Sequence, residues 1–164
     1  MGKILKAHFA RNKIKKAIEW DEFEIDLTGY TEIQDEAAKA LSECELSIDL
    51  RDLEILSDKA AEYFSNHGKS IDLAKVFELT PVAAKWLAKK RSFIHFEMPT
   101  ITQEIAGIFA KGNARLKFTK LEELNDSDEH IALLNYLRET GQLGRLPSYV
   151  EIPSSVKKRF PELG

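Results

Sequence analysis

The tetrapeptide SIDL stands at residues 47–50 and again at 70–73, and EIDL stands at 24–27. The copies begin at positions 24, 47 and 70, so each lies 23 residues after the one before it. Apolar and polar residues alternate in all three, which predicts short strands with one buried face. A recurring segment at a constant interval indicates an internal repeat of structural units.

Four apolar columns keep this register over five successive units. The first two columns, expected on the buried strand face, are Ile25, Ile48, Ile71, Ile94, Leu116 and Leu27, Leu50, Leu73, Phe96, Phe118. The next two are Tyr30, Leu53, Val76, Met98, Leu121 and Ile33, Leu56, Leu79, Ile101, Leu124. One strand per unit at a fixed interval predicts a parallel sheet formed by consecutive units.

Each unit then changes to helical spacing. The predicted helix N-caps are Ser57, Thr80, Thr102 and, after a two-residue insertion in the fifth unit, Ser127. Hydroxyl oxygens at these positions can accept the free N–H groups of the first turn. Two consecutive alanines stand near the start of the predicted helix in each of the first three units, at 37–38, 60–61 and 83–84. Their small side chains allow each helix to lie close to its strand and to the next helix.

These patterns predict an α/β fold. We expect a right-handed strand–helix solenoid, with a parallel sheet on one face and short helices on the other. A single repeat domain is expected over residues 1–164. It comprises an N-terminal cap helix in 1–22, five repeats of 22–25 residues in 23–139, and a C-terminal capping tail in 140–164. Trp20 is expected to seal the N-terminal end, and residues 149–152 and 154–160 to add a strand and a helical turn.

The segments 24–44, 47–69 and 70–91 together resemble a leucine-rich repeat, of the short bacterial, ribonuclease-inhibitor-like kind. Two positions depart from that pattern. The usual asparagine after the strand is replaced by Tyr30, Leu53, Val76, Met98 and Leu121, and a leucine before it by Glu22, Glu45, Gly68, Arg91 and Asn113. The chain therefore resembles a divergent repeat of this type. The resemblance implies protein recognition through the concave strand face, and it brings no catalytic residues.

Composition narrows the class of protein. Cys44 is the only cysteine among 164 residues, which excludes an internal disulfide and favours a reducing, cytoplasmic location. No apolar run is long enough for a signal peptide or a membrane span. The formal net charge of −3 gives no indication of a nucleic-acid partner.

The strand residues that point away from the core form the candidate partner-binding surface. The selected residues are Asp26, Asp49, Arg51, Asp72, Phe93, His95, Arg115 and Lys117. Their charge runs from acidic in the first units to basic in the last, which would orient a partner of complementary charge. Phe93 and His95 are the anchor candidates. The alternative interpretation is an ordinary solvated strand face, in which Arg51 neutralises Asp26 or Asp49.

A second apolar stripe lies on the predicted helices, at Ala40, Tyr63, Trp86, Ile108 and Leu133. Packing between neighbouring helices explains it most simply. The alternative is an exposed patch at Tyr63 and Trp86 through which the chain associates with itself.

Motifs for catalysis and cofactor binding are absent from the sequence. It has no glycine-rich phosphate loop and no HExxH, so no cofactor and no metal are predicted. Cys44 and His67 fall in equivalent loops of neighbouring units, where a thiol and an imidazole could lie close together. A second catalytic arrangement would require Asp49, Asp72 and His95 to converge. We expect a non-enzymatic protein-binding module, monomeric or a weak homodimer, with an unknown protein partner. A self-associating scaffold and a small inhibitor or immunity-type protein are the alternatives.

Overall fold

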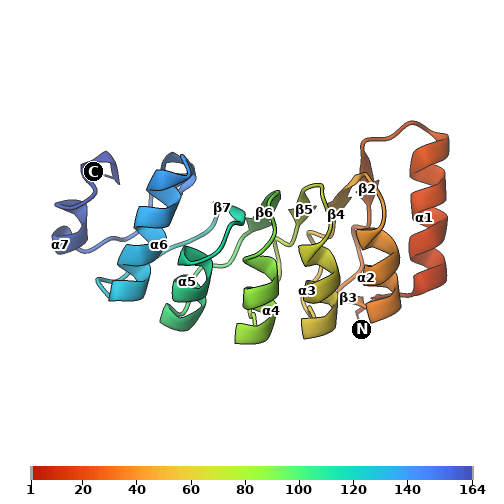
Figure 1. Cartoon of the computed structure of the whole chain (residues 1–164), viewed down its shortest axis with the longest axis horizontal. Coiled ribbons are helices and arrows are strands. Elements are labelled where there is room, and N and C mark those ends of the chain that lie inside the picture. Colours follow the sequence, from red (N-terminus) through yellow and green to blue (C-terminus); the bar gives the residue numbers. More distant parts are fainter. Residues whose placement is uncertain (1, 164) are drawn as a thin grey trace.

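The computed structural model describes residues 2–163, in which strands and helices alternate along an elongated molecule (Figure 1). The strands are β1 (Ile4–Leu5), β2 (Glu24–Asp26), β3 (Glu32–Ile33), β4 (Ser47–Asp49), β5 (Ile71–Asp72), β6 (Phe93–Phe96) and β7 (Arg115–Phe118). The helices are α1 (Ala7–Glu19), α2 (Asp35–Ser42), α3 (Asp58–Ser65), α4 (Pro81–Leu87), α5 (Gln103–Ala110), α6 (Asp128–Glu139) and α7 (Ser154–Lys157). Two short 3-10 helices, η1 (Leu143–Arg145) and η2 (Pro161–Leu163), lie in the tail.

Five strands form one parallel sheet in the order β2-β4-β5-β6-β7. Their pairing places Ile25 beside Ile48, Ile48 beside Ile71, Ile71 beside Ile94, and Ile94 beside Leu116. This is the register that the repeat predicts, so the α/β class, the parallel sheet and the strand–helix alternation are confirmed. The right hand of the winding and the leucine-rich-repeat type stay predictions.

The core lies between the sheet and the row of helices (Figure 1). The predicted alanine pairs have no exposed surface in α2, α3 and α4: Ala37, Ala38, Ala60, Ala61, Ala83 and Ala84. Larger rings fill the later units, where Phe96 lies 6.0 Å from both Phe109 and Phe118, centroid to centroid. Because each apolar side chain lies against residues of the adjacent unit, the units stabilise one another.

Hydroxyl caps open four helices as predicted. The side-chain oxygens of Ser57, Thr80, Thr102 and Ser127 accept the N–H groups of Ala60, Ala83, Ile105 and His130 at 3.0–3.3 Å. Two cap hydroxyls also donate to the preceding helix: Ser57 to Asp35 at 2.6 Å, and Thr80 to Asp58. These bonds tie the N-terminal ends of α2, α3 and α4 together.

The N-terminal cap differs from the prediction in two respects. Residues 4–5 are not helical but form β1, which pairs in parallel with β3, and α1 begins only at Ala7. Leu5 is fully buried in this strand, whereas Trp20 is 70% exposed and does not seal the core. The small residues Ala10 and Ala17 form the buried face of α1 instead. These small side chains face α2, with which α1 is in contact.

The C-terminal tail follows the predicted pattern. A parallel bridge joins Glu123 and Glu151, so the segment 149–152 adds one further short pairing, and α7 provides the helical turn after it. Val156 and Phe160 are buried against the last units. The tail therefore covers the C-terminal end of the core.

Candidate partner-binding face

The strand face is formed by the side chains of β2, β4, β5, β6 and β7 that point away from the helices. Of the selected residues, Asp26, Arg51, Arg115 and Lys117 are exposed, and Asp72, Phe93 and His95 are half-buried. Asp49 is the exception, because it is only 3% exposed. The prediction that all eight side chains are open to a partner is therefore wrong for Asp49.

Arg51 covers Asp49 and forms a bidentate ion pair with it. The guanidinium Nε of Arg51 lies 2.9 Å from each carboxylate oxygen, and the Arg51 backbone N–H donates to Oδ1 at 3.1 Å. The same carboxylate raises the pKa of the guanidinium. Of the two partners that the sequence allowed for Arg51, the structure selects Asp49. Asp26 is satisfied locally, since the hydroxyl and N–H of Thr28 donate to it and lower its pKa.

A chain of hydrogen bonds crosses the next three strands. His95 Nδ1 lies 3.0 Å from Asp72 Oδ2, and Nε2 lies 2.7 Å from the hydroxyl of Thr119. Burial by itself would raise the pKa of Asp72, but the contacts with His95 and with the N–H of Ala74 lower it. The structure thus joins Asp72 with His95, as the enzyme alternative requires, but pairs Asp49 elsewhere.

The order carboxylate, imidazole, hydroxyl is one that enzymes use to activate a nucleophile. Here the N–H of Thr119 already donates to Phe96 O at 3.1 Å, so it is not free to stabilise an oxyanion. The hydrogen bonds from His95 to Asp72 and Thr119 join side chains across the sheet.

Carboxylates dominate the face at β2, β4 and β5. Burial and the neighbouring Asp49 raise the pKa of Glu24, as expected where like charges share one side of a sheet. The basic half lies at β6 and β7. The guanidinium of Arg115 lies 4.4 Å from the centre of the Phe93 ring, and that of Arg145 lies 4.8 Å from it.

Arg145 is a residue of this face that the sequence does not reveal. It belongs to η1, in the tail, 30 positions after Arg115, and nothing in the repeat register places it here. The tail is held nearby because the Tyr149 hydroxyl donates to Thr119 O at 2.9 Å. A cavity of about 250 Å³ lies between the two halves and is lined by Glu24, Ile48, Ser70, Ile71, Asp72, Phe93, His95, Lys117 and Arg145.

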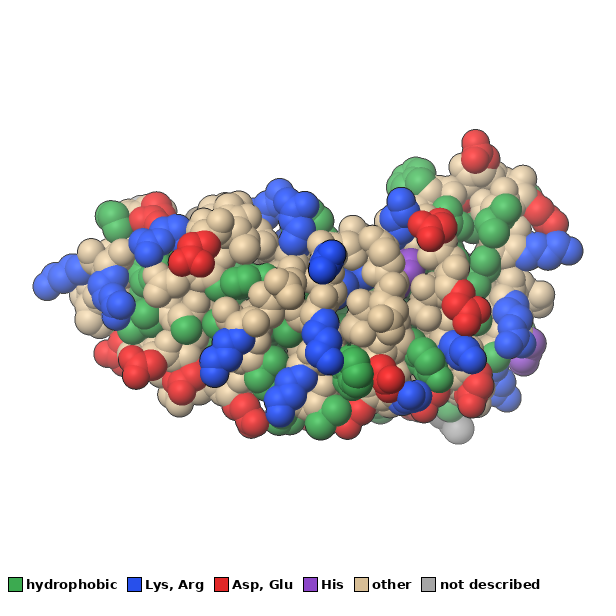
Figure 2. All heavy atoms as spheres, viewed as in Figure 1, with side chains coloured by type: hydrophobic (Ala, Val, Ile, Leu, Met, Phe, Trp, Pro, Cys, Tyr) green, Lys and Arg blue, Asp and Glu red, His purple; other side chains and the backbone are tan. Residues whose placement is uncertain are grey.

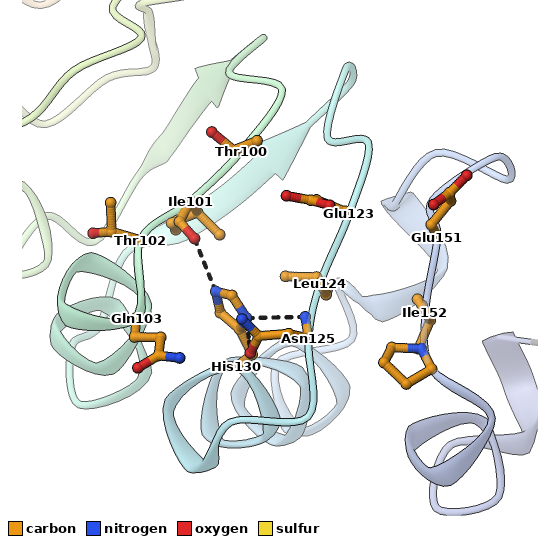
Figure 3. Close-up of a pocket in the computed structure, with 11 residues that line it drawn as sticks. Thr100, Ile101, Thr102, Gln103, Glu123, Leu124, Asn125, His130, Glu151 and Ile152 are labelled. Carbon is orange, nitrogen blue, oxygen red and sulfur yellow. Dashed lines mark hydrogen bonds between the residues drawn. The ribbon is translucent and has the colours of Figure 1, made fainter.

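A larger cavity, of about 640 Å³, lies where α5 and α6 begin and the tail passes (Figure 3). His130 forms one wall and is almost completely buried. Its Nε2 lies 2.8 Å from Ile101 O, and its Nδ1 accepts the N–H of Asn125 at 3.1 Å. The loop before α6, which contains Asn125, comes from the two-residue insertion before Ser127. That insertion is the only feature of the sequence that indicates this cavity. Since both ring nitrogens have partners within the chain, His130 holds the loop.

Three loop residues at the same position of successive units, Cys44, His67 and Lys90, form a mostly buried column. Burial raises the pKa of the Cys44 thiol, and Cys44 has no hydrogen bond to His67 in the part of the chain described. Burial and the adjacent Lys90 lower the pKa of His67 to about 4. Burial lowers the pKa of Lys90 to about 8, and its ammonium group donates to the carbonyls of His67 and Lys69.

On the helix side, Tyr63 and Trp86 are half-buried against the core. Lys59 and Lys89 lie over their rings, at 5.1 and 3.8 Å from the ring centres. This arrangement agrees with packing between helices. On the face of the molecule drawn in Figure 2, acidic and basic side chains are interspersed.

Comparisons with family models, with curated proteins and with solved structures give no match to this chain. No helix within residues 2–163 has the length and apolar character needed to cross a membrane. Over the same residues, no three potential metal-binding side chains of His, Cys, Asp or Glu are grouped together.

Proposed function

We propose that this chain is a protein-binding module of the leucine-rich-repeat-like solenoid type, and that the strand face contacts the partner. The observation that carries this proposal is the ordering of charge over five adjacent strands. Carboxylates, one of them paired with Arg51, occupy one half of the face. In the other half Arg115 and Arg145 lie over a half-buried phenylalanine, and Lys117 lies on the same strand as Arg115. Such a surface can steer and orient a partner of opposite charge order.

The rigidity of the face also supports binding. Parallel pairing fixes the strands, and the Asp49–Arg51 and Asp72–His95 contacts hold side chains in place before any partner arrives. A surface ordered in advance loses less conformational entropy on association. We further propose a cytoplasmic location, supported by the lone cysteine, and a monomer or weak homodimer.

The test is capture of partners from cells of the source organism, identified by mass spectrometry and confirmed by calorimetry with the purified partner. Two charge reversals probe the two halves of the face, Asp26→Lys and Lys117→Glu. Their matched controls reverse the same charges at exposed positions off the sheet, Asp126→Lys and Lys157→Glu. We expect both face variants to lose the partner and both controls to keep it. Equal binding by all four variants would exclude the strand face.

Self-association through the helix side is the competing function, and it is measured with the same proteins. Trp86→Ala would lower the mass seen by light scattering if that stripe joined two copies, and it would leave capture through the strand face intact. The half-buried state of Trp86 favours a structural role for this residue.

A further inference from the structure

The basic half of the strand face has three cations without a carboxylate partner. Within residues 2–163, Arg115, Lys117 and Arg145 form no ion pair shorter than 4.0 Å. Nearby cations on the same side of the sheet do find partners. Arg51 pairs with Asp49, Lys75 with Asp52, and Lys120 with Glu97. What distinguishes these three groups is that they lie together: Arg115 and Arg145 lie over the Phe93 ring, and Lys117 lines the same cavity as Phe93 and Arg145.

Their arrangement gives the folded chain little stability. Both guanidinium groups lie over the Phe93 ring, at 4.4 and 4.8 Å from its centre, so one side chain holds two like charges near each other, and these charges repel. Each stacking contact offsets part of this repulsion. An anion placed near both guanidinium groups would be attracted by each of them and would offset their mutual repulsion.

Stacking also prepares the two arginines for binding. A guanidinium lying over an aromatic ring keeps its N–H edges free, and those edges match the two oxygens of a carboxylate. Arg115 comes from β7, Phe93 from β6 and Arg145 from η1, so three separate segments fix the geometry. The cavity of about 250 Å³ beside them is lined by Phe93, Lys117 and Arg145, and towards the acidic half by Glu24 and Asp72.

We infer that Arg115, Lys117 and Arg145, arranged around Phe93, bind an acidic segment of a protein partner through its carboxylate side chains. This inference rests on the proposed function and specifies the chemistry of the partner. The other half of the face carries Glu24 and Asp26, which would repel a polyanion that continued past the basic cluster. The surroundings therefore favour a short acidic stretch over the continuous phosphate backbone of a nucleic acid.

The probe is a synthetic hexaglutamate peptide, titrated into the full chain at low ionic strength and followed by amide NMR shifts. A hexaglutamine peptide and single-stranded oligothymidine are the comparison ligands. We expect binding of hexaglutamate that weakens with salt, shifts centred on β6, β7 and η1, and weaker binding of both other ligands.

Arg115→Ala and Arg145→Ala should each weaken hexaglutamate binding by about tenfold, the effect of losing one charge-assisted contact. Lys157→Ala, which removes an exposed cation elsewhere in the tail, should leave binding unchanged. Arg145→Lys keeps the positive charge, and so tests whether weaker binding by Arg145→Ala comes only from misfolding of the variant. It should still weaken binding, because an ammonium group lacks the planar fork.

Equal affinity for hexaglutamate and hexaglutamine, or equal loss in the Lys157→Ala control, would overturn the inference. Tighter binding of oligothymidine would assign the cluster to nucleic acid instead. If the inference fails while Asp26→Lys still abolishes partner capture, the proposed function stands without this subsite. If Asp26→Lys and Lys117→Glu both leave capture intact, the proposed function fails as well.

Discussion

His67 should make the stability of this protein depend on pH in the weakly acidic range. The side chain is 2% exposed, and neither ring nitrogen has a hydrogen-bond partner in the described part of the chain. Burial and the charge of Lys90 lower its pKa from 6.5 to about 4, and backbone groups of Ser42 and Leu46 offset only part of this effect. The unfolded chain therefore binds a proton at a pH where the folded chain does not.

Stability is lost as pH falls through this window, because the unfolded state takes up the proton first. At pH 5, about 1.5 pH units below the unfolded-state pKa, the loss is about 2 kcal/mol relative to pH 7.5. Lys90, with a pKa of about 8, is largely protonated over this range and adds only a small slope near pH 7.5.

The assay is urea unfolding followed by circular dichroism at several pH values between 7.5 and 5. His67→Leu removes the titrating group and the unsatisfied nitrogens, so its stability should fall less over the same range. His8→Leu, at an exposed position, is the control and should follow the unmodified chain. Parallel curves for His67→Leu and the unmodified chain would refute a buried neutral imidazole.

Three further outcomes are expected. Ser57→Ala should lower the unfolding free energy by about 1 kcal/mol, because α3 loses its cap, and Ser57→Thr should restore most of it in the same urea assay. Phe109→Ala should cost about 3–5 kcal/mol by opening a cavity, whereas Phe77→Ala, at a position 52% exposed, should stay within about 0.5 kcal/mol; equal losses would contradict the assigned core. Iodide should quench the fluorescence of Trp20 more strongly than that of Trp86. The variants Trp20→Phe and Trp86→Phe each leave one tryptophan, so the two signals can be measured separately. Equal quenching would contradict the exposed indole of Trp20.

The register of the sheet was predictable because the same short apolar pattern recurs in each of the five units. Ile48 and Ile71 recur in the same context, so one pairing fixes the others. The caps were predictable for the same reason, since Ser57 and its equivalents act on N–H groups three residues away.

The ends of the chain and the finer arrangement of the candidate site were not predictable. Ile4 and Leu5 fit a helical spacing with α1, but backbone pairing with β3 outweighs that pattern. Strand alternation placed Asp49 on the outer side correctly but could not show that Arg51 covers it. Arg145 reaches Phe93 only because the tail folds back, which depends on contacts distant in sequence.

The open sheet has two edge strands of opposite character, β2 with Glu24 and Asp26, and β7 with Arg115 and Lys117. Copies placed head to tail would bring these edges together with favourable electrostatics, and because the contact does not close on itself it would continue into a filament. At one end α1 stands beside β2, and at the other the tail takes up the carbonyls of Thr119 and Glu122. The two terminal segments thus lie against the two ends of the sheet, where a further strand would have to add.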